Sequence, residues 1–197
     1  MSDYSKTFKS YTNRVSELLS LVDSSEVTNL VTSIRDTVSN GGTIYVLGNG
    51  GSATTASHFV NDLTIINKHK GINIKAISLV DSMATITAIS NDNSFEEVFK
   101  FQLLNRLQKG DLVFSISASG NSTNLINAVT YANELGAVTS SLLGFDGGIL
   151  KTKSKYMCLV SSSIGEYGPV EDAHLAICHY LSLSIQVEQQ IHDIETK

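Results

Sequence analysis

Imidazole and carboxylate side chains recur at helical spacing in two stretches of this chain. His58 and Asp62 are four residues apart, so in a helix they lie on one face. A second set lies late in the chain, within an apolar stretch: Glu171, Asp172, His174 and His179. A single histidine in such a stretch is more often a satisfied core residue. Together, however, the two sets supply the groups that acid–base catalysis or a zinc site requires.

The geometry of the late set restricts how these groups can meet. In a helix, His179 is two turns from Asp172 and faces the same way, whereas Glu171 is offset by about 80°. Glu171 and His179 therefore serve one centre equally well only if the helix begins between Glu171 and Asp172, or if two subunits share the site.

Two loops rich in glycine or hydroxyl groups come directly after apolar runs and before helical patterns. The first contains Asn49, Gly50, Gly51 and Ser52, and the second contains Ser117, Ala118, Ser119 and Ser122. Glycine lets the backbone approach a ligand, and hydroxyls together with free helix-start N–H groups hold an anion. A tight turn explains the first loop equally well, and capping by Asn121 or Ser122 is the structural alternative for the second. The hydroxyl density of the second loop favours a phosphate site.

Asn91 and Asp92 form a third candidate, after a helical pattern over 83–90. Ser94 and Glu97 form a predicted capping box for the next helix, which explains the turn but not Asp92. A ligand contact and a structural role are equally supported at this position.

The elements that must position these residues alternate between strands and helices. Short apolar, β-branched runs predict strands at 43–48, 74–79, 112–117, 138–143 and 156–161. Helical patterns lie between them at 53–66, 83–90, 95–107 and 122–135, and a last helix spans about 170–190. This alternation predicts a three-layer αβα sandwich around a five-stranded parallel sheet. Ligands of such sheets bind beyond the carboxyl ends of the strands, where both loops lie.

The two ends of the chain add helices to this core. The first forty residues predict two helices, the second capped by Asp23 and ended by Gly41-Gly42. We expect one domain over 1–197, with 1–40 as a helical arm and 43–193 as the αβα core. Residues 173–187 are apolar nearly all round, which is typical of a helix buried on more than one side. We therefore expect a homo-oligomer.

Composition excludes several classes of protein. The 197 residues are 42% hydrophobic and 17% charged, which excludes a disordered chain. The net charge of -5 and the scattered basic residues argue against nucleic-acid binding. We expect no membrane span, because no run of about 18 apolar residues occurs, and we see no signal peptide. Two cysteines outside any CxxC pair favour a reducing cytoplasm.

The motifs together resemble the SIS (sugar isomerase) domain. The segments are 47–63 (LGNGGSATTASHFVNDL), Asn91-Asp92, 115–122 (SISASGNS), Asp146-Gly147-Gly148 and 171–179 (EDAHLAICH). Their order and spacing resemble those of bacterial phosphoheptose isomerases over nearly the whole chain. The resemblance implies a flavodoxin-like fold, a homotetramer and bound zinc. It also implies interconversion of sedoheptulose 7-phosphate and D-glycero-D-manno-heptose 7-phosphate for lipopolysaccharide or capsule.

The resemblance also implies roles for individual residues. His58 matches a metal ligand, and His179 matches a metal ligand that is also the catalytic acid. The family's catalytic glutamate is Asp62 here, its glutamine is Glu171, and an aspartate–arginine pair is replaced by Gly168-Pro169. We predict Asp62 as the base of a cis-enediolate mechanism, and a metal held by His58, Asp62, Glu171 and His179. The predicted substrate contacts are Asn49, Gly50, Gly51, Ser52, Asn91, Asp92, Ser117, Ala118, Ser119, Ser122 and Glu171.

Other functions are compatible with the same motifs. The changes at Asp62 and Glu171 favour, as an alternative, an isomerase of another sugar phosphate. A non-catalytic relative of the DnaA initiator-associating type lacks the second histidine of the last helix, so His179 favours an enzyme. A sugar-phosphate-sensing regulator would need a DNA-binding module, and none is evident in the sequence.

Overall fold

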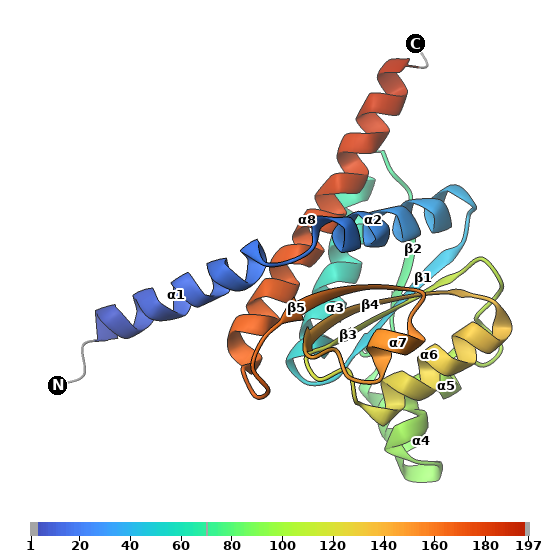
Figure 1. Ribbon diagram of the computed structural model, residues 1–197. Coiled ribbons are helices and arrows are strands. Elements are labelled where there is room, and N and C mark those ends of the chain that lie inside the picture. Colours follow the sequence, from blue (N-terminus) through green and yellow to red (C-terminus); the bar gives the residue numbers. More distant parts are fainter. Residues whose placement is uncertain (1–3, 70, 196–197) are drawn as a thin grey trace.

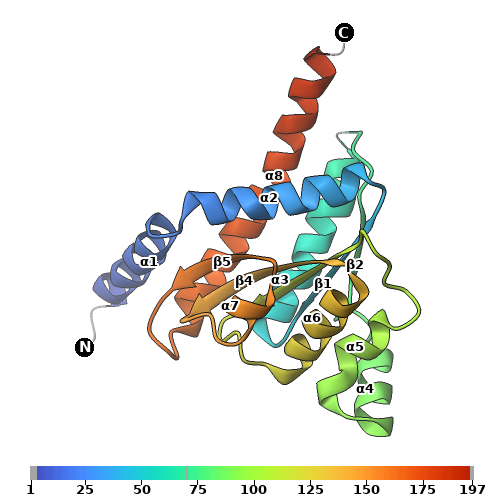
Figure 2. The ribbon, with the colours of Figure 1, turned by 45° about the vertical axis from the view of Figure 1, so that its right-hand side comes forward.

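A computed structural model describes residues 4–69 and 71–195, with residues 186–195 described by their backbone alone. The chain begins with the two predicted helices, α1 (Tyr4–Ser20) and α2 (Ser24–Ser39). Asp23 caps α2 by accepting a hydrogen bond from the Ser25 N–H, and Gly41 turns the chain away with a φ of 71°. Helix α1 projects from the body of the molecule in both ribbon views (Figures 1 and 2).

The described residues contain a five-stranded, all-parallel sheet in the order β2-β1-β3-β4-β5. The strands are β1 (Thr43–Gly48), β2 (Lys75–Ser78), β3 (Leu112–Ser117), β4 (Val138–Phe145) and β5 (Tyr156–Ser161). This order is the flavodoxin-like one, in which the winding direction reverses between β1 and β3. The glycine loop after β1 and the hydroxyl loop after β3 therefore flank the switch point, where ligands of such sheets bind.

Helices cover both faces of the sheet (Figure 1). One layer contains α2, α3 (Gly51–Asn61) and α8 (Tyr167–Glu195), and the other contains α4 (Met83–Asp92), α5 (Val98–Leu103), α6 (Thr123–Leu135) and α7 (Leu150–Lys153). Alternate strand residues feed the two cores: Ile44 and Val46 face the first layer, and Tyr45 and Leu47 face the second. The predicted three-layer αβα sandwich is confirmed.

Two helices differ from the predicted ones. The helix predicted over 53–66 changes at Asp62 into a π-helical turn, η1 (Asp62–Ile66), in which the Asn67 N–H bonds to the Asp62 carbonyl. The helix predicted over 95–107 starts as a 3₁₀ turn, η2 (Phe95–Glu97), and α5 ends before Asn105, whose φ is 67°.

The capping box predicted from Ser94 and Glu97 is wrong. The Ser94 side chain makes no capping hydrogen bond at the start of η2. The Glu97 carboxylate instead accepts a hydrogen bond from Asn127 Nδ2 at 3.1 Å, which ties this turn to α6. Glu97 thus bonds to a residue that is distant in sequence and not to the backbone of Ser94, as a capping box requires.

Helix α8 joins the N-terminal arm to the core. Two side chains of α1 reach its start: Tyr11 donates to Asp172 Oδ2 at 2.6 Å, and Arg14 forms two hydrogen bonds with Glu166. Further along, Tyr180 and Leu183 are 57% and 58% exposed. The side chains of 186 and 187, at the end of the predicted all-round apolar stretch, lie outside the described residues. None of the described helices is long and apolar enough to cross a membrane.

Candidate active site

Helices α3 and α8 pack side by side and bring two histidines and an aspartate together. His58 and Asp62 lie on α3 and at its end, and His179 lies on α8. The two Nε2 atoms are 3.0 Å apart, and Asp62 Oδ2 lies 3.4 Å from His58 Nε2 and 3.7 Å from His179 Nε2. The Asp62 side chain is buried, whereas both imidazoles are about half exposed. A buried carboxylate thus faces two imidazoles that open to solvent.

The three side chains suit a metal ion by both chemistry and spacing. Their ligand atoms all lie within 4.8 Å of one another. Nitrogen ligands about 2.0–2.1 Å from a tetrahedral ion are about 3.4 Å apart, close to the separations seen here. Histidine and carboxylate ligands in this arrangement, with exposure on one side, match a metal site that keeps a position open for another ligand.

A second feature of the site is a polar pocket of about 140 Å³ at the carboxyl ends of β1 and β3. Its lining combines both predicted loops with the start of α8: Asn49, Ser52, Ile116, Ser117, Ala118, Ser119, Ser122, Tyr167 and Glu171. Among these described residues there is no lysine or arginine. An anion bound here would depend on hydroxyl groups and on backbone N–H groups.

The hydroxyl loop owes its shape to contacts with the loop after β4. Gly120 has a φ of 62°, and a Cβ there would overlap the Gly147 carbonyl. Asn121 accepts a hydrogen bond from the Ile149 N–H at 3.0 Å, which fixes the outer side of the loop. Ser122 precedes α6 but makes no side-chain capping bond. Its hydroxyl and the α6 N-terminus are therefore available to a ligand.

Two residues at the pocket, Asn124 and Tyr167, were not predicted from the sequence. Asn49 exchanges two hydrogen bonds with Asn124 of α6, at 2.9 and 3.0 Å, so this partner holds its amide in place. Tyr167, the first residue of α8, also lines the pocket. Neither role has a local signal in the sequence, because tertiary folding brings Asn124 to Asn49 and Tyr167 to the two loops.

Glu171 lies in the polar pocket rather than among the histidines. Its carboxylate lies against Gly51, the first residue of α3, where a Cβ would overlap it. The eight residues from Glu171 to His179 correspond to about 12 Å along α8. The group within 4.8 Å contains His58, Asp62 and His179 without Glu171. A role for Glu171 as fourth metal ligand stays a prediction.

Asn91 and Asp92 lie apart from this pocket. They end α4, are exposed, and are joined by a hydrogen bond from Asn91 Nδ2 to Asp92 Oδ1 at 2.9 Å. The lining of the polar pocket does not include them. Their predicted contact with substrate stays a prediction.

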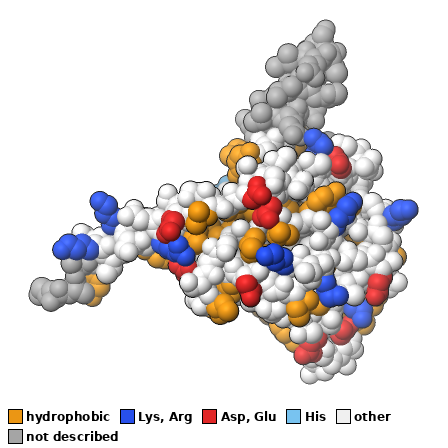
Figure 3. Space-filling model, in the orientation of Figure 1, with side chains coloured by type: hydrophobic (Ala, Val, Ile, Leu, Met, Phe, Trp, Pro, Cys, Tyr) orange, Lys and Arg blue, Asp and Glu red, His pale blue; other side chains and the backbone are white. Residues whose placement is uncertain are grey.

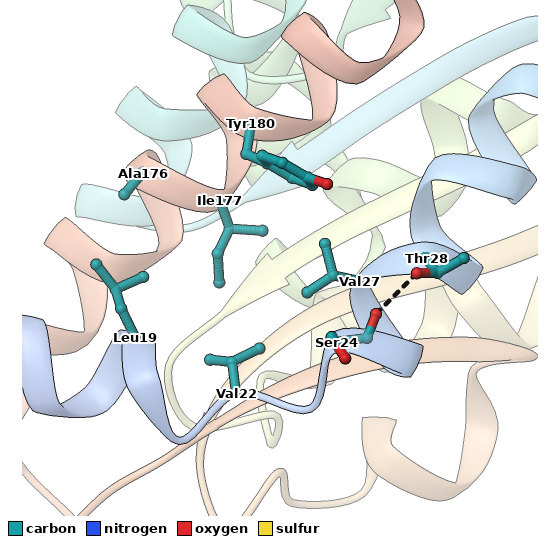
Figure 4. A pocket seen from close by; sticks show the side chains of 8 residues that line it. All are labelled: Leu19, Val22, Ser24, Val27, Thr28, Ala176, Ile177 and Tyr180. Carbon is teal, nitrogen blue, oxygen red and sulfur yellow. Dashed lines mark hydrogen bonds between the residues drawn. The ribbon is translucent and has the colours of Figure 1, made fainter. Parts of the chain in front are cut away.

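A larger hollow, of about 440 Å³, lies between the N-terminal helices and α8 (Figure 4). Its lining is mostly apolar: Leu19, Val22, Ser24, Val27, Thr28, Ala176, Ile177 and Tyr180. Hydrophobic side chains gather on this face, between α1 and the body (Figure 3). No carboxylate or imidazole lines it among the described residues, in contrast to the smaller polar pocket and the histidine–aspartate cluster.

The fold and this site define a SIS-domain protein, since the model of the SIS domain family matches residues 8–144. The curated relatives narrow the class. The chain is 39% identical to a phosphoheptose isomerase of Helicobacter pylori (strain HPAG1), over 74% of this chain and 75% of the relative. It is 34% identical to that of Chlorobaculum parvum, over 87% and 82%. A phosphoheptose isomerase structure from Francisella tularensis superposes with a TM-score of 0.84 at 26% identity, covering 94% and 99%.

The chain therefore belongs to the phosphoheptose isomerase family.

Proposed function

We propose that this chain interconverts sedoheptulose 7-phosphate and D-glycero-D-manno-heptose 7-phosphate, an aldose–ketose isomerisation that supplies heptose for surface polysaccharide. The cluster of His58, Asp62 and His179 beside a hydroxyl-lined pocket carries this proposal. The pocket suits the phosphate, because Ser119 and Ser122 offer hydroxyls next to the α6 N-terminus. The cluster lies about two helical turns further along α3, a separation that suits the two ends of a seven-carbon sugar phosphate.

In this mechanism, Asp62 is the base. One of its oxygens, Oδ2, faces the two imidazoles, which leaves Oδ1 to take a proton. The carboxylate removes the proton from the hydroxyl-bearing carbon beside the carbonyl and returns it to the other carbon of the enediolate. His179 moves the accompanying proton between the two oxygens. Its half-exposed ring can reach a substrate while its Nε2 stays near Asp62.

The same residues would hold a divalent metal, and we propose zinc because two imidazoles and a carboxylate are ligands it prefers. When bound, the metal polarises the substrate carbonyl and stabilises the enediolate oxygens. Asp62 would then help to hold the metal and would also act as the base.

We also propose a homotetramer located in the cytoplasm. Helix α1 projects from its own chain with Tyr4 and Phe8 80% and 70% exposed, and the apolar hollow against Tyr180 lies open on the same molecule. Exposed aromatic side chains on the arm and an apolar hollow on the same chain complement each other between copies. Both cysteines are buried free thiols, which suits a reducing compartment.

The decisive experiment is incubation of the purified protein with sedoheptulose 7-phosphate, with the product followed by NMR. Appearance of the anomeric signals of D-glycero-D-manno-heptose 7-phosphate supports the proposal. No conversion by the metal-loaded protein contradicts it. A second candidate is isomerisation of another sugar phosphate, favoured by the Glu171 carboxylate in the polar pocket, and pentose and hexose phosphates in the same assay test it.

A further inference from the structure

The π-helical turn after Asp62 contains a buried hydrogen-bond junction at Asn67. The Asn67 side chain is completely buried. Its Nδ2 donates to the Asp62 carbonyl oxygen at 2.9 Å and to Ser182 Oγ at 3.0 Å. The Asn67 backbone N–H bonds to the same carbonyl, so two donors of one residue hold the backbone of Asp62.

The orientation of this amide follows from its neighbours. The Asp62 carbonyl can only accept, so the atom facing it must be the NH₂ group. That leaves Asn67 Oδ1 buried without a hydrogen-bond partner among the described residues. A buried oxygen without a partner lowers the stability of the fold. An apolar side chain of similar shape would pack here without this cost. We therefore attribute the amide to the two hydrogen bonds that it donates, to the Asp62 carbonyl and to Ser182.

The junction connects the two helices that carry the proposed base and acid. Ser182 follows His179 by three residues, so the two lie on neighbouring parts of one face of α8. The π-helical turn begins at Asp62, and turns of this kind occur often at functional sites. Through Asn67, the backbone of Asp62 is tied directly to the segment of α8 that carries His179.

We propose that Asn67 is a positioning residue for the isomerisation, which fixes the Asp62 carboxylate relative to His179 through its bonds to the Asp62 carbonyl and Ser182. The proposal rests on the function proposed above. The reacting groups lie 3.4 to 3.7 Å apart, and small displacements in such a site reduce turnover strongly.

The test compares three variants with the wild-type protein. Asn67→Leu keeps nearly the same shape and removes both side-chain hydrogen bonds, to the Asp62 carbonyl and to Ser182, while the backbone N–H stays. Ser182→Ala removes only the bond to α8. Ser33→Ala is the matched control, because it breaks another buried hydroxyl contact, with Ser140 at 2.9 Å, between α2 and β4 and away from the site. Each variant is checked for folding by circular dichroism and thermal unfolding. We measure kcat and KM, and the zinc affinity of the metal-free protein by competition with a chromophoric chelator.

We expect Asn67→Leu to lower kcat and zinc affinity about 10- to 100-fold, as for other residues that orient metal ligands, with KM nearly unchanged. Ser182→Ala should lower kcat about two- to tenfold, the equivalent of one neutral hydrogen bond. Ser33→Ala should lower only the melting temperature. If Asn67→Leu does not fold, Ser182→Ala decides.

The inference is overturned if Asn67→Leu and Ser182→Ala reduce kcat and zinc affinity no more than Ser33→Ala does. It is also overturned if KM rises as much as kcat falls. Wild-type protein without activity on sedoheptulose 7-phosphate contradicts the proposed function instead, and the zinc affinities then decide the role of Asn67. Wild-type protein that neither turns over the sugar nor binds zinc overturns both.

Discussion

The polar pocket and the histidine–aspartate cluster are built in different ways. The pocket takes Ser117, Ala118, Ser119 and Ser122 from one short loop, whose shape depends on Gly120 and on the neighbouring loop after β4. The cluster joins His58 to His179, which are 121 residues apart in the chain. The pocket therefore depends on local backbone geometry, whereas the cluster depends on how α3 packs against α8. Damage to one should leave the other working, and this independence can be tested.

The largest expected effect comes from removing an imidazole of the cluster. His179→Ala should lower kcat about 10²- to 10⁴-fold, the usual contribution of a positioned acid–base group. Calorimetric binding of the sugar phosphate should change little, because the polar pocket is intact. His69→Ala, which removes an exposed imidazole just beyond the π-helical turn, is the matched control. Full turnover by His179→Ala would exclude it as the acid.

Helix α8 also carries an imidazole that serves neither region. His174 is completely buried, and burial lowers its pKa from 6.5 to about 4. Between about pH 6.5 and pH 4, His174 binds a proton in the unfolded chain but not in the folded chain. The free energy of unfolding therefore falls as the pH drops through this range. The loss should reach about 3 kcal/mol.

Urea unfolding at pH 7 and at pH 4.5 measures this effect, with His174→Leu as the comparison. The variant should lose less stability between the two pH values than the wild type does. Equal losses in both proteins would show that other groups cause the acid sensitivity.

Removing hydroxyls from the polar pocket should produce the converse of His179→Ala. Ser119→Ala and Ser122→Ala should each weaken sugar phosphate binding by about 1.5–3 kcal/mol, the value of a hydrogen bond to a charged group. The kcat at saturation should stay close to that of the wild type. Ser163→Ala, in an exposed loop, is the control. Unchanged binding in both pocket variants would show that the phosphate binds elsewhere.

The same contrast explains what the sequence could predict. The parallel sheet and the two loops were predictable, because short β-branched runs and adjacent glycine or serine residues are local signals. The π-helical turn at Asp62 was not, since one extra residue in a helical turn hardly changes apolar spacing. The position of Glu171 depends on which residues of α8 face α3, and the role of Asn67 depends on Ser182. Tertiary packing decides both.

The smallest expected effect decides to which region Glu171 belongs. Its carboxylate lines the polar pocket, and among the described lining residues it is the only charged side chain. A carboxylate there repels a phosphate, so Glu171→Gln should strengthen sugar phosphate binding by about 1 kcal/mol, the scale of two charges about 4 Å apart in water. Zinc affinity should stay unchanged, because the metal cluster forms without this residue. If Glu171 is instead the fourth metal ligand, the same variant loses zinc affinity.

Asp172→Asn is the matched control. Asp172 is the next residue in the chain, but its carboxylate accepts a hydrogen bond from Tyr11 on α1 and does not line the pocket. Isothermal titration with the sugar phosphate and chelator competition for zinc, performed on both variants, separate the two assignments.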